Sequence, residues 1–107
     1  IGLAGGLFEK SCIAKGLTFM PEGFIDRSYR SNGTLTPRTE QGAVIVDQGK
    51  SLAQAKALAL GTEIETSDHQ LISPVVKTLC VHGDNPNAVV IAHALSNNLK
   101  DSGISIL

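Results

Sequence analysis

Short apolar runs alternate along the chain with longer segments whose apolar residues recur every three or four positions. The short runs are too brief for helices and rich in β-branched residues, which is typical of buried strands. We predict strands or extended segments at 1–4, 24–26, 63–66, 72–81 and 104–106, and a further strand or a turn at 43–46. Strands that alternate with helices predict an α/β fold with a parallel sheet and right-handed crossovers.

Three longer segments have helical spacing, and a glycine that can end a helix follows each of them. We predict helices at 7–15, before Gly16, at 50–60, before Gly61, and at 86–100, before Gly103. The third helix has the clearest start, because the preceding asparagine can cap it and its first residue is proline, which is favoured there. The first helix is expected to turn its apolar side chains inward, and these are Leu7, Phe8, Cys12 and Ile13.

Two turns are indicated by local residue types. Asn32-Gly33 lies between two extended pieces in the segment 29–35, and Asn-Gly in that setting is the strongest short-range signal for a β-hairpin. Asp68–Gln70 separates the strand at 63–66 from the extended segment that follows. Both turns connect predicted strands without a helix between them.

Composition limits the classes of partner. The chain has 107 residues, 42% of them hydrophobic, which suits one soluble domain or a piece of one. A net charge of −1 creates no field to attract nucleic acid or an acidic membrane, and no apolar stretch approaches the roughly 20 residues of a membrane span. Cys12 and Cys80 lack metal-site spacing, and although a disulfide is conceivable, we expect a reduced, cytoplasmic protein.

The pentapeptide Cys80-Val81-His82-Gly83-Asp84 stands where a predicted strand gives way to a helix, which is where α/β proteins keep their chemistry. Side chains alternate along a strand, so His82 should share a face with Cys80, opposite Val81. In the functional interpretation, His82 is a general base or hydrogen-bond donor and Asp84 orients it or positions a cation or water. In the structural interpretation, Asp84 accepts backbone N–H groups of the turn and His82 is a satisfied, half-buried polar residue.

A second polar group is Asp26, Arg27 and Tyr29, with Arg38 further along. An arginine fork suits a carboxylate or a phosphate, so all four residues are candidates for binding substrate. The alternatives are a salt bridge from Asp26 or Glu40 to Arg27, a packing role for Tyr29 with its hydroxyl bonded, and a solubilising role for Arg38.

Two stretches carry a family resemblance. Residues 24–29, 33–38 and 42–45 resemble the pattern F-A-D-R-x-Y, G-x-L-x-x-R and G-A-x-I of the LamB/YcsF family, and residues 78–89 resemble its T-x-C-V-H-G-D-x-P-x-A-V signature. Order and spacing also agree, and the opening segment 1–5 is similar to the family strand that precedes them. One departure is Asp68-His69, where the family pattern has Asp-Gly.

The resemblance implies a fold and a function. The family fold is an irregular β/α barrel similar to that of polysaccharide deacetylases, and residues 1–107 resemble only its C-terminal part. The family supplies the A subunit of bacterial ATP-dependent 5-oxoprolinase, which cleaves 5-oxo-L-proline to L-glutamate. This implies His82 and Asp84 as catalytic residues, ATP, a 5-oxoproline substrate and further 5-oxoprolinase subunits as partners. A need for a divalent metal is left open.

The N-terminal half of the family pattern, with its N-x-D-x-G-E, G-x-H-P and K-P-H-G-x-L-Y segments, has no counterpart here. Strands cut from a barrel leave an unpaired edge and an exposed apolar face, so we expect residues 1–107 to associate with the missing half or with themselves. This chain alone is expected to be inactive.

Two other functions compete with the oxoprolinase. A metal-assisted deacetylase or amidase would need more ligands than His82 and Asp84, which are the only candidates here. A non-catalytic half-barrel that helps to assemble the other subunits is the second alternative. A nucleotide loop at Gly2–Gly6 is not expected, because the segment lacks G-x-G-x-x-G spacing and a Walker lysine.

Overall fold

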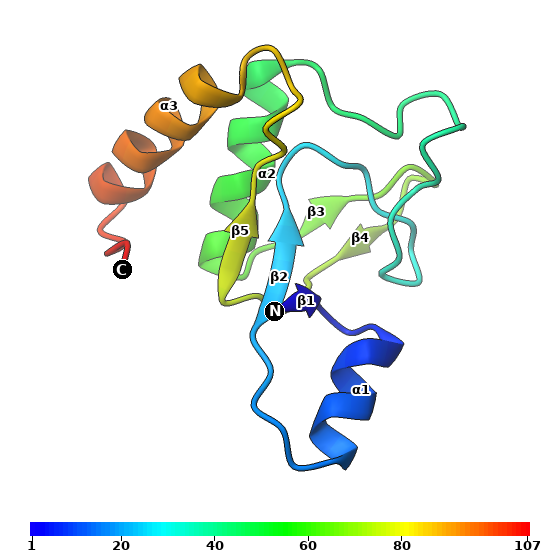
Figure 1. Ribbon diagram of the computed structural model, residues 1–107. Helices are drawn as coiled ribbons and strands as arrows, with labels where there is room; N and C mark the ends of the chain where they lie inside the picture. Colours follow the sequence, from blue (N-terminus) through cyan, green and yellow to red (C-terminus); the bar gives the residue numbers. More distant parts are fainter.

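A three-stranded parallel sheet forms the centre of the computed structural model, which describes residues 1–107 (Figure 1). Its strands are β1 (Gly2–Leu3), β2 (Pro21–Phe24) and β5 (Thr78–Cys80), in the order β1-β2-β5. All neighbours are parallel, and Phe24 pairs with Cys80 at the carboxyl ends of β2 and β5. The predicted α/β class and the parallel sheet are therefore confirmed, with an open sheet whose outer strands are β1 and β5.

Two helices cover one side of this sheet. Helix α2 (Gln48–Leu60) packs against β2 and β5, and α3 (Ala88–Asp101) packs mainly on α2 (Figure 1). The Asp47 side chain caps α2 by accepting from the Lys50 N–H at 2.8 Å, and Gly61 ends it in a left-handed conformation. The predicted helix at 50–60 and its stop at Gly61 are confirmed.

The hydrophobic core lies between these helices and the sheet. Its larger cluster joins residue 25, just after β2, to inward positions of α2 and α3, and consists of Ile25, Ala55, Ile91, Leu95 and Leu99. A second cluster, under the loops, consists of Tyr29, Leu58 and Ile64. Val81 packs on the larger cluster, as expected for the strand face opposite Cys80 and His82.

Two loops are fastened together beside the sheet. Strands β3 (Ile64–Glu65) and β4 (Leu71–Ile72) form an antiparallel hairpin around the predicted turn at 68–70. The Asn-Gly hairpin is also present, as a single bridge between Tyr29 and Leu35. Asp68 joins the two, because its carboxylate accepts from the backbone N–H and hydroxyl of Ser31 at 3.0 and 2.6 Å.

His69 has a φ of 58°, the left-handed region that favours glycine. This is the position at which the family resemblance led us to expect Asp-Gly. With histidine at this position, the β3–β4 turn is intact, since the Thr66 hydroxyl donates to the Asp68 carboxylate within it at 2.6 Å.

Several predicted boundaries were wrong. The second strand ends at Phe24 instead of Asp26, and residues 43–46 contribute only one bridge, between Val44 and Arg27. The third helix starts at Ala88, two residues after Pro86, and residues 104–106 are not a strand. The extended segment 72–81 is divided between β4 and β5, which belong to different sheets. The strand boundaries are set by pairing between strands, which local residue types do not show, whereas a local turn at Asn85–Asn87 delays the start of α3.

Helix α1 (Leu7–Ala14) also corrects an expectation. Only Cys12 on it is buried, whereas Leu7, Phe8 and Ile13 are 82%, 60% and 63% exposed. It packs on β1, and it forms a separate lobe below the sheet in Figure 1. Its apolar face has no second layer to pack against, which explains the exposure.

No helix in the structure combines the length and the apolar character needed to cross a bilayer.

Candidate functional site

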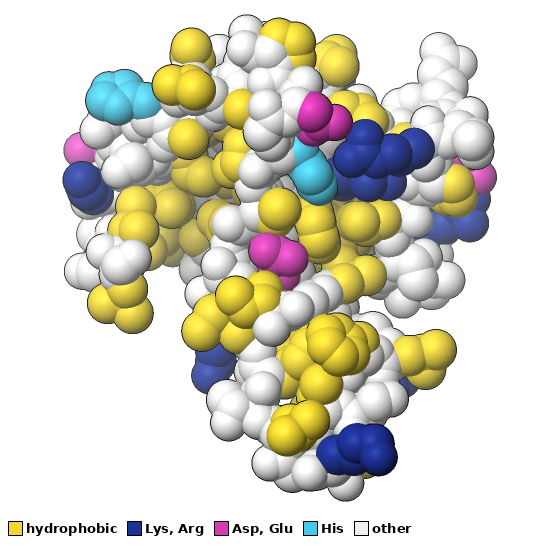
Figure 2. Space-filling model, viewed as in Figure 1, with side chains coloured by type: hydrophobic (Ala, Val, Ile, Leu, Met, Phe, Trp, Pro, Cys, Tyr) yellow, Lys and Arg dark blue, Asp and Glu magenta, His cyan; other side chains and the backbone are white.

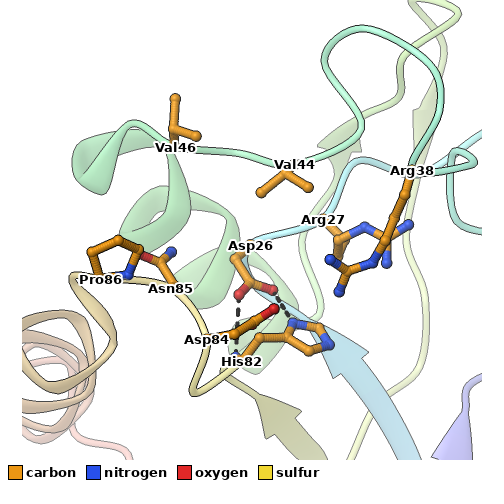
Figure 3. A pocket seen from close by; sticks show the side chains of 9 residues that line it. All are labelled: Asp26, Arg27, Arg38, Val44, Val46, His82, Asp84, Asn85 and Pro86. Atoms are coloured by element: carbon orange, nitrogen blue, oxygen red, sulfur yellow. Dashed lines mark hydrogen bonds and ion pairs between the residues drawn. The ribbon is translucent and has the colours of Figure 1, made fainter.

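A small cavity opens at the carboxyl ends of β2 and β5, where the loops that leave the two strands meet (Figure 3). Its volume of about 170 Å³ is below the roughly 300 Å³ at which pockets for drug-sized ligands begin, so it suits a small molecule. On the molecular surface, a histidine lies here between acidic and basic side chains (Figure 2). The lining residues are Asp26, Arg27, Arg38, Val44, Val46, His82, Asp84, Asn85 and Pro86.

The register of the sheet brings Asp26 and His82 together. Phe24 pairs with Cys80 in parallel strands, so Asp26 and His82, each two residues further along the chain, also face one another. Asp26 Oδ1 lies 2.8 Å from His82 Nδ1, and Asp26 Oδ2 accepts from the His82 backbone N–H at 3.2 Å (Figure 3). The His82 ring also stacks on Phe24, with centroids 5.5 Å apart and 17° between the planes. We had expected Asp84 to orient the histidine, and the structure places Asp26 in that position.

The backbone around Asp26 is fixed from two sides. The Asp26 carbonyl accepts from the Ile45 N–H at 2.8 Å. From α2, the Gln54 side-chain amide donates to the carbonyls of both Phe24 and Arg27, each at 2.8 Å. Gln54 was not among the residues predicted from the sequence, although its polar side chain beside the apolar face of α2 was a usable signal. Asp26 itself is 2% exposed, so its carboxylate has little freedom to approach a ligand.

Arg27 and Arg38 lie on the same side of the cavity (Figure 3). Arg27 is buried, and its guanidinium donates to the carbonyls of Thr36 at 2.8 Å and Ala43 at 3.3 Å. It makes no salt bridge, so the alternative partners Asp26 and Glu40 are both excluded; Glu40 pairs with Arg30 instead. Arg38 is exposed and has no ion pair within the protein. Two guanidinium groups without a carboxylate partner make this side of the cavity suitable for an anion.

Asp84 and the start of α3 form another part of the wall. Asp84 is exposed, and it makes no hydrogen bond to His82. The Asn85 side chain accepts from the Asn87 N–H at 2.9 Å, which forms a turn before the helix instead of the helix cap we predicted. Asp84 therefore lies at the cavity with its carboxylate free to meet a ligand or water.

Tyr29 does not line the cavity, which corrects its expected role in binding substrate. Its side chain is 1% exposed and packs with Leu58 and Ile64. The hydroxyl accepts from the Phe24 backbone N–H at 2.9 Å, and burial, with smaller effects from nearby groups, raises the pKa of the Tyr29 phenol. This is the packing role with a bonded hydroxyl that we had weighed as the alternative.

Both cysteines are free thiols. Burial raises the pKa of the Cys80 thiol, and the nearby carboxylates of Glu22 and Asp26 raise it further. The neutral thiol is a poor nucleophile, so Cys80 is not a candidate for covalent catalysis.

No group of three or more His, Cys, Asp or Glu side chains in residues 1–107 has an arrangement that could hold a metal ion. Asp26 and Asn85 also line the cavity, but their side-chain oxygens are hydrogen-bonded to His82 and to the Asn87 N–H. The Asp84 carboxylate and the free nitrogen of His82 remain for a cation, fewer protein ligands than the three or four of a typical zinc site.

Comparison with known proteins gives concordant results. Residues 1–107 match the model described as the LamB/YcsF family. The chain is 37% identical over 106 residues to the 5-oxoprolinase A subunit of Streptomyces coelicolor, covering 99% of this chain and 42% of that protein. It is 42% identical over 104 residues to the 5-oxoprolinase A subunit of Heliobacterium modesticaldum, covering 97% and 41%.

A solved structure is also similar, the lactam utilization protein from Thermus thermophilus. The TM-score is 0.87 at 30% sequence identity, over 97% of this chain and 41% of that one. The chain thus spans about two fifths of the length of the relatives it matches.

Proposed function

This chain belongs to the LamB/YcsF family, and we propose that it carries part of the active site of a 5-oxoprolinase A subunit. The reaction is the cleavage of 5-oxo-L-proline to L-glutamate, coupled to ATP hydrolysis. The observation that carries the proposal is the cavity in which His82 and Asp84 face Arg27 and Arg38, with the names of the similar proteins in support.

The arrangement supplies the groups that lactam opening requires. The amide of a five-membered lactam resists attack by water, and ATP would supply the driving force by transferring its γ-phosphoryl group to the lactam carbonyl oxygen, with ADP as the leaving group. Water would then add to that carbon, the C–N bond would break as the ring nitrogen takes a proton, and phosphate would be released. His82 acts as the general base that takes a proton from the attacking water, and Asp84 positions that water. Arg27 and Arg38 bind negative charge, either the carboxylate of 5-oxoproline or a phosphoryl group, and so stabilise the charge that develops.

The rest of the protein completes the fold in this proposal. The outer edge of β5 is unpaired, and an apolar groove of about 580 Å³ runs between β5 and α3, toward the hollow of Figure 2 that apolar side chains line. The accessible surface is 6727 Å², whereas a compact protein of 11.2 kDa exposes about 5,700 Å². The additional length of the relatives would pair with β5 and close the sheet into the family's irregular β/α barrel. Other oxoprolinase subunits would then join the whole.

The test measures 5-oxoproline-dependent formation of glutamate and phosphate by the native full-length protein with its partner subunits. His82→Ala and Asp84→Asn should each lower kcat by about 100-fold or more, because each removes a group that acts on the water. His93→Ala is the matched control, since His93 is exposed on α3, outside the cavity. It should leave kcat unchanged.

Circular dichroism and thermal unfolding establish that each variant is folded. Normal turnover by both His82→Ala and Asp84→Asn would refute the site. A wild-type assembly without 5-oxoproline-dependent ATP hydrolysis would refute the function.

A further inference from the structure

We propose that Asp26 is a positioning residue, whose buried carboxylate holds the neutral His82 ring in the tautomer protonated at Nδ1 and leaves Nε2 as the basic atom at the cavity. The tautomer follows from the geometry alone. Its use in catalysis rests on the function proposed above, with His82 as general base.

The hydrogen bonds between the two residues determine the tautomer. An ionised carboxylate only accepts hydrogen bonds, and Asp26 presents one oxygen to the His82 backbone N–H and the other to Nδ1. At 2.8 Å, the contact with Nδ1 is a hydrogen bond only if that nitrogen carries the proton. In a neutral ring, Nε2 then has the free lone pair.

The surroundings keep this pair in place. Gln54 and the Ile45 N–H hold the backbone on both sides of Asp26, and Phe24 stacks on the ring of His82. Nε2 has no hydrogen-bond partner within the protein and, in Figure 3, points away from Asp26. The Nδ1 atom of His82 is therefore bonded to Asp26, and Nε2 is free to interact with a ligand at the cavity.

The pairing also matters after proton transfer. When Nε2 accepts a proton from water, the ring becomes positively charged, and the adjacent Asp26 carboxylate stabilises that charge. The Asp26 carboxylate is shielded from competing water, because Asp26 is buried, whereas the half-buried His82 ring opens to the cavity. Asp84 makes no hydrogen bond or ion pair with the ring and is not needed for either effect.

Replacing Asp26 with asparagine makes a specific prediction. The amide has the same shape but one accepting oxygen and one donating NH₂ group. The His82 backbone N–H can only donate, so it takes the oxygen, and the NH₂ group then faces Nδ1. The ring must accept there and carry its proton on Nε2, which removes the base from the cavity.

The experiment combines NMR with kinetics on the native full-length protein labelled with ¹⁵N-histidine. Long-range ¹H–¹⁵N spectra, recorded where the ring is neutral, identify the protonated nitrogen of His82. Wild type should be protonated at Nδ1 and Asp26→Asn at Nε2. Asp84→Asn, the matched control for the tautomer, should keep the wild-type pattern. In turnover assays Asp26→Asn should lower kcat by about 100-fold, with KM within about threefold of wild type.

Each result decides the proposal. Protonation of wild-type His82 at Nε2 overturns it, even if Asp26→Asn fails to fold, and so does an unchanged tautomer in a folded Asp26→Asn. An inverted tautomer with undiminished kcat overturns the positioning role while leaving the oxoprolinase function standing. Conversely, a wild-type assembly that does not turn over 5-oxoproline refutes that function, whereas the tautomer result remains valid.

Discussion

Asp26 and His82 lie 56 positions apart in the chain, yet one carboxylate binds both the backbone N–H and the ring Nδ1 of the histidine. The two residues follow neighbouring parallel strands whose register aligns Phe24 with Cys80. The register of the sheet therefore positions the candidate site, and the loops after β2 and β5 supply its polar groups. Four substitutions, each with a matched control, test this site and the contacts that support the structure around it.

Arg38→Gln should weaken binding of the anionic substrate. Arg38 lines the cavity and has no ion-pair partner, so its loss removes one of the two guanidinium groups that attract the anion and leaves only Arg27. We expect KM for 5-oxoproline to rise about tenfold, which corresponds to about 1.4 kcal/mol of binding. Steady-state kinetics of the full-length assembly measure this.

The matched control for that change is Arg30→Gln. Arg30 forms an exposed ion pair with Glu40 outside the cavity, and exposed pairs contribute little to stability. KM should stay within about twofold of wild type. Equal KM values for both variants would show that Arg38 does not contact substrate.

Tyr29→Phe should reduce stability without changing KM. The substitution leaves the half-buried Phe24 N–H without its acceptor, and loss of this hydrogen bond costs about 1 kcal/mol in the free energy of unfolding. Urea unfolding measures the loss. Ser28→Ala, which removes only a long 3.5 Å hydrogen bond in the same region, should change stability by less than about 0.5 kcal/mol. A raised KM with unchanged stability would restore the substrate-binding role of Tyr29.

Gln54→Glu should destabilise the loop that carries Asp26. The amide donates to two carbonyls at 2.8 Å, and a carboxylate of the same shape would instead place negative oxygens against them. We expect a loss of about 3 kcal/mol or more in the free energy of unfolding at pH 7. Gln48→Glu, at the exposed start of α2 where acids are favoured, should have no such effect. Comparable stability of the two variants would contradict the anchoring role.

The ionisation of Asp68 makes the free energy of unfolding depend on pH. Hydrogen bonds from Ser31 and Thr66 lower the pKa of Asp68 from 3.8 to about 2 in the folded state. The folded state therefore favours the carboxylate, so this stabilisation is complete above about pH 5 and is lost as the pH falls toward 2.

Urea unfolding as a function of pH checks this. The midpoint of Asp68→Asn should lie below that of wild type at pH 7, and the difference should shrink between pH 5 and pH 2. Asp101→Asn, at the exposed end of α3, is the control and should follow the wild-type curve. A constant difference between Asp68→Asn and wild type would contradict the linkage.

Much of the fold was predictable because its signals are local. The apolar spacing of residues 50–60 and the glycine after them predicted α2 and its end, and Asn32-Gly33 predicted its hairpin. The α1 prediction was correct in position and wrong in burial, because whether Leu7 and Phe8 are covered depends on a second layer of structure that periodicity does not reveal.

The candidate site was predictable in part for the same reason. The turn after a predicted strand identified His82 and Asp84, and both line the cavity. The division of roles was not predictable, because Tyr29 and Arg27 are near neighbours in sequence while only Arg27 reaches the cavity.

The sequence by itself determined the α/β class, the helices and the family, since spacing, caps and motifs depend on residues close together in the chain. Only the tertiary structure decided that Asp26, not Asp84, binds His82, and that Arg27 and Arg38 share one wall. Those contacts depend on strand register and on the burial of Ile25 and Ile91 in one core, which bring together segments more than 50 residues apart. Local residue types do not determine that register, because the register results from packing across the whole domain.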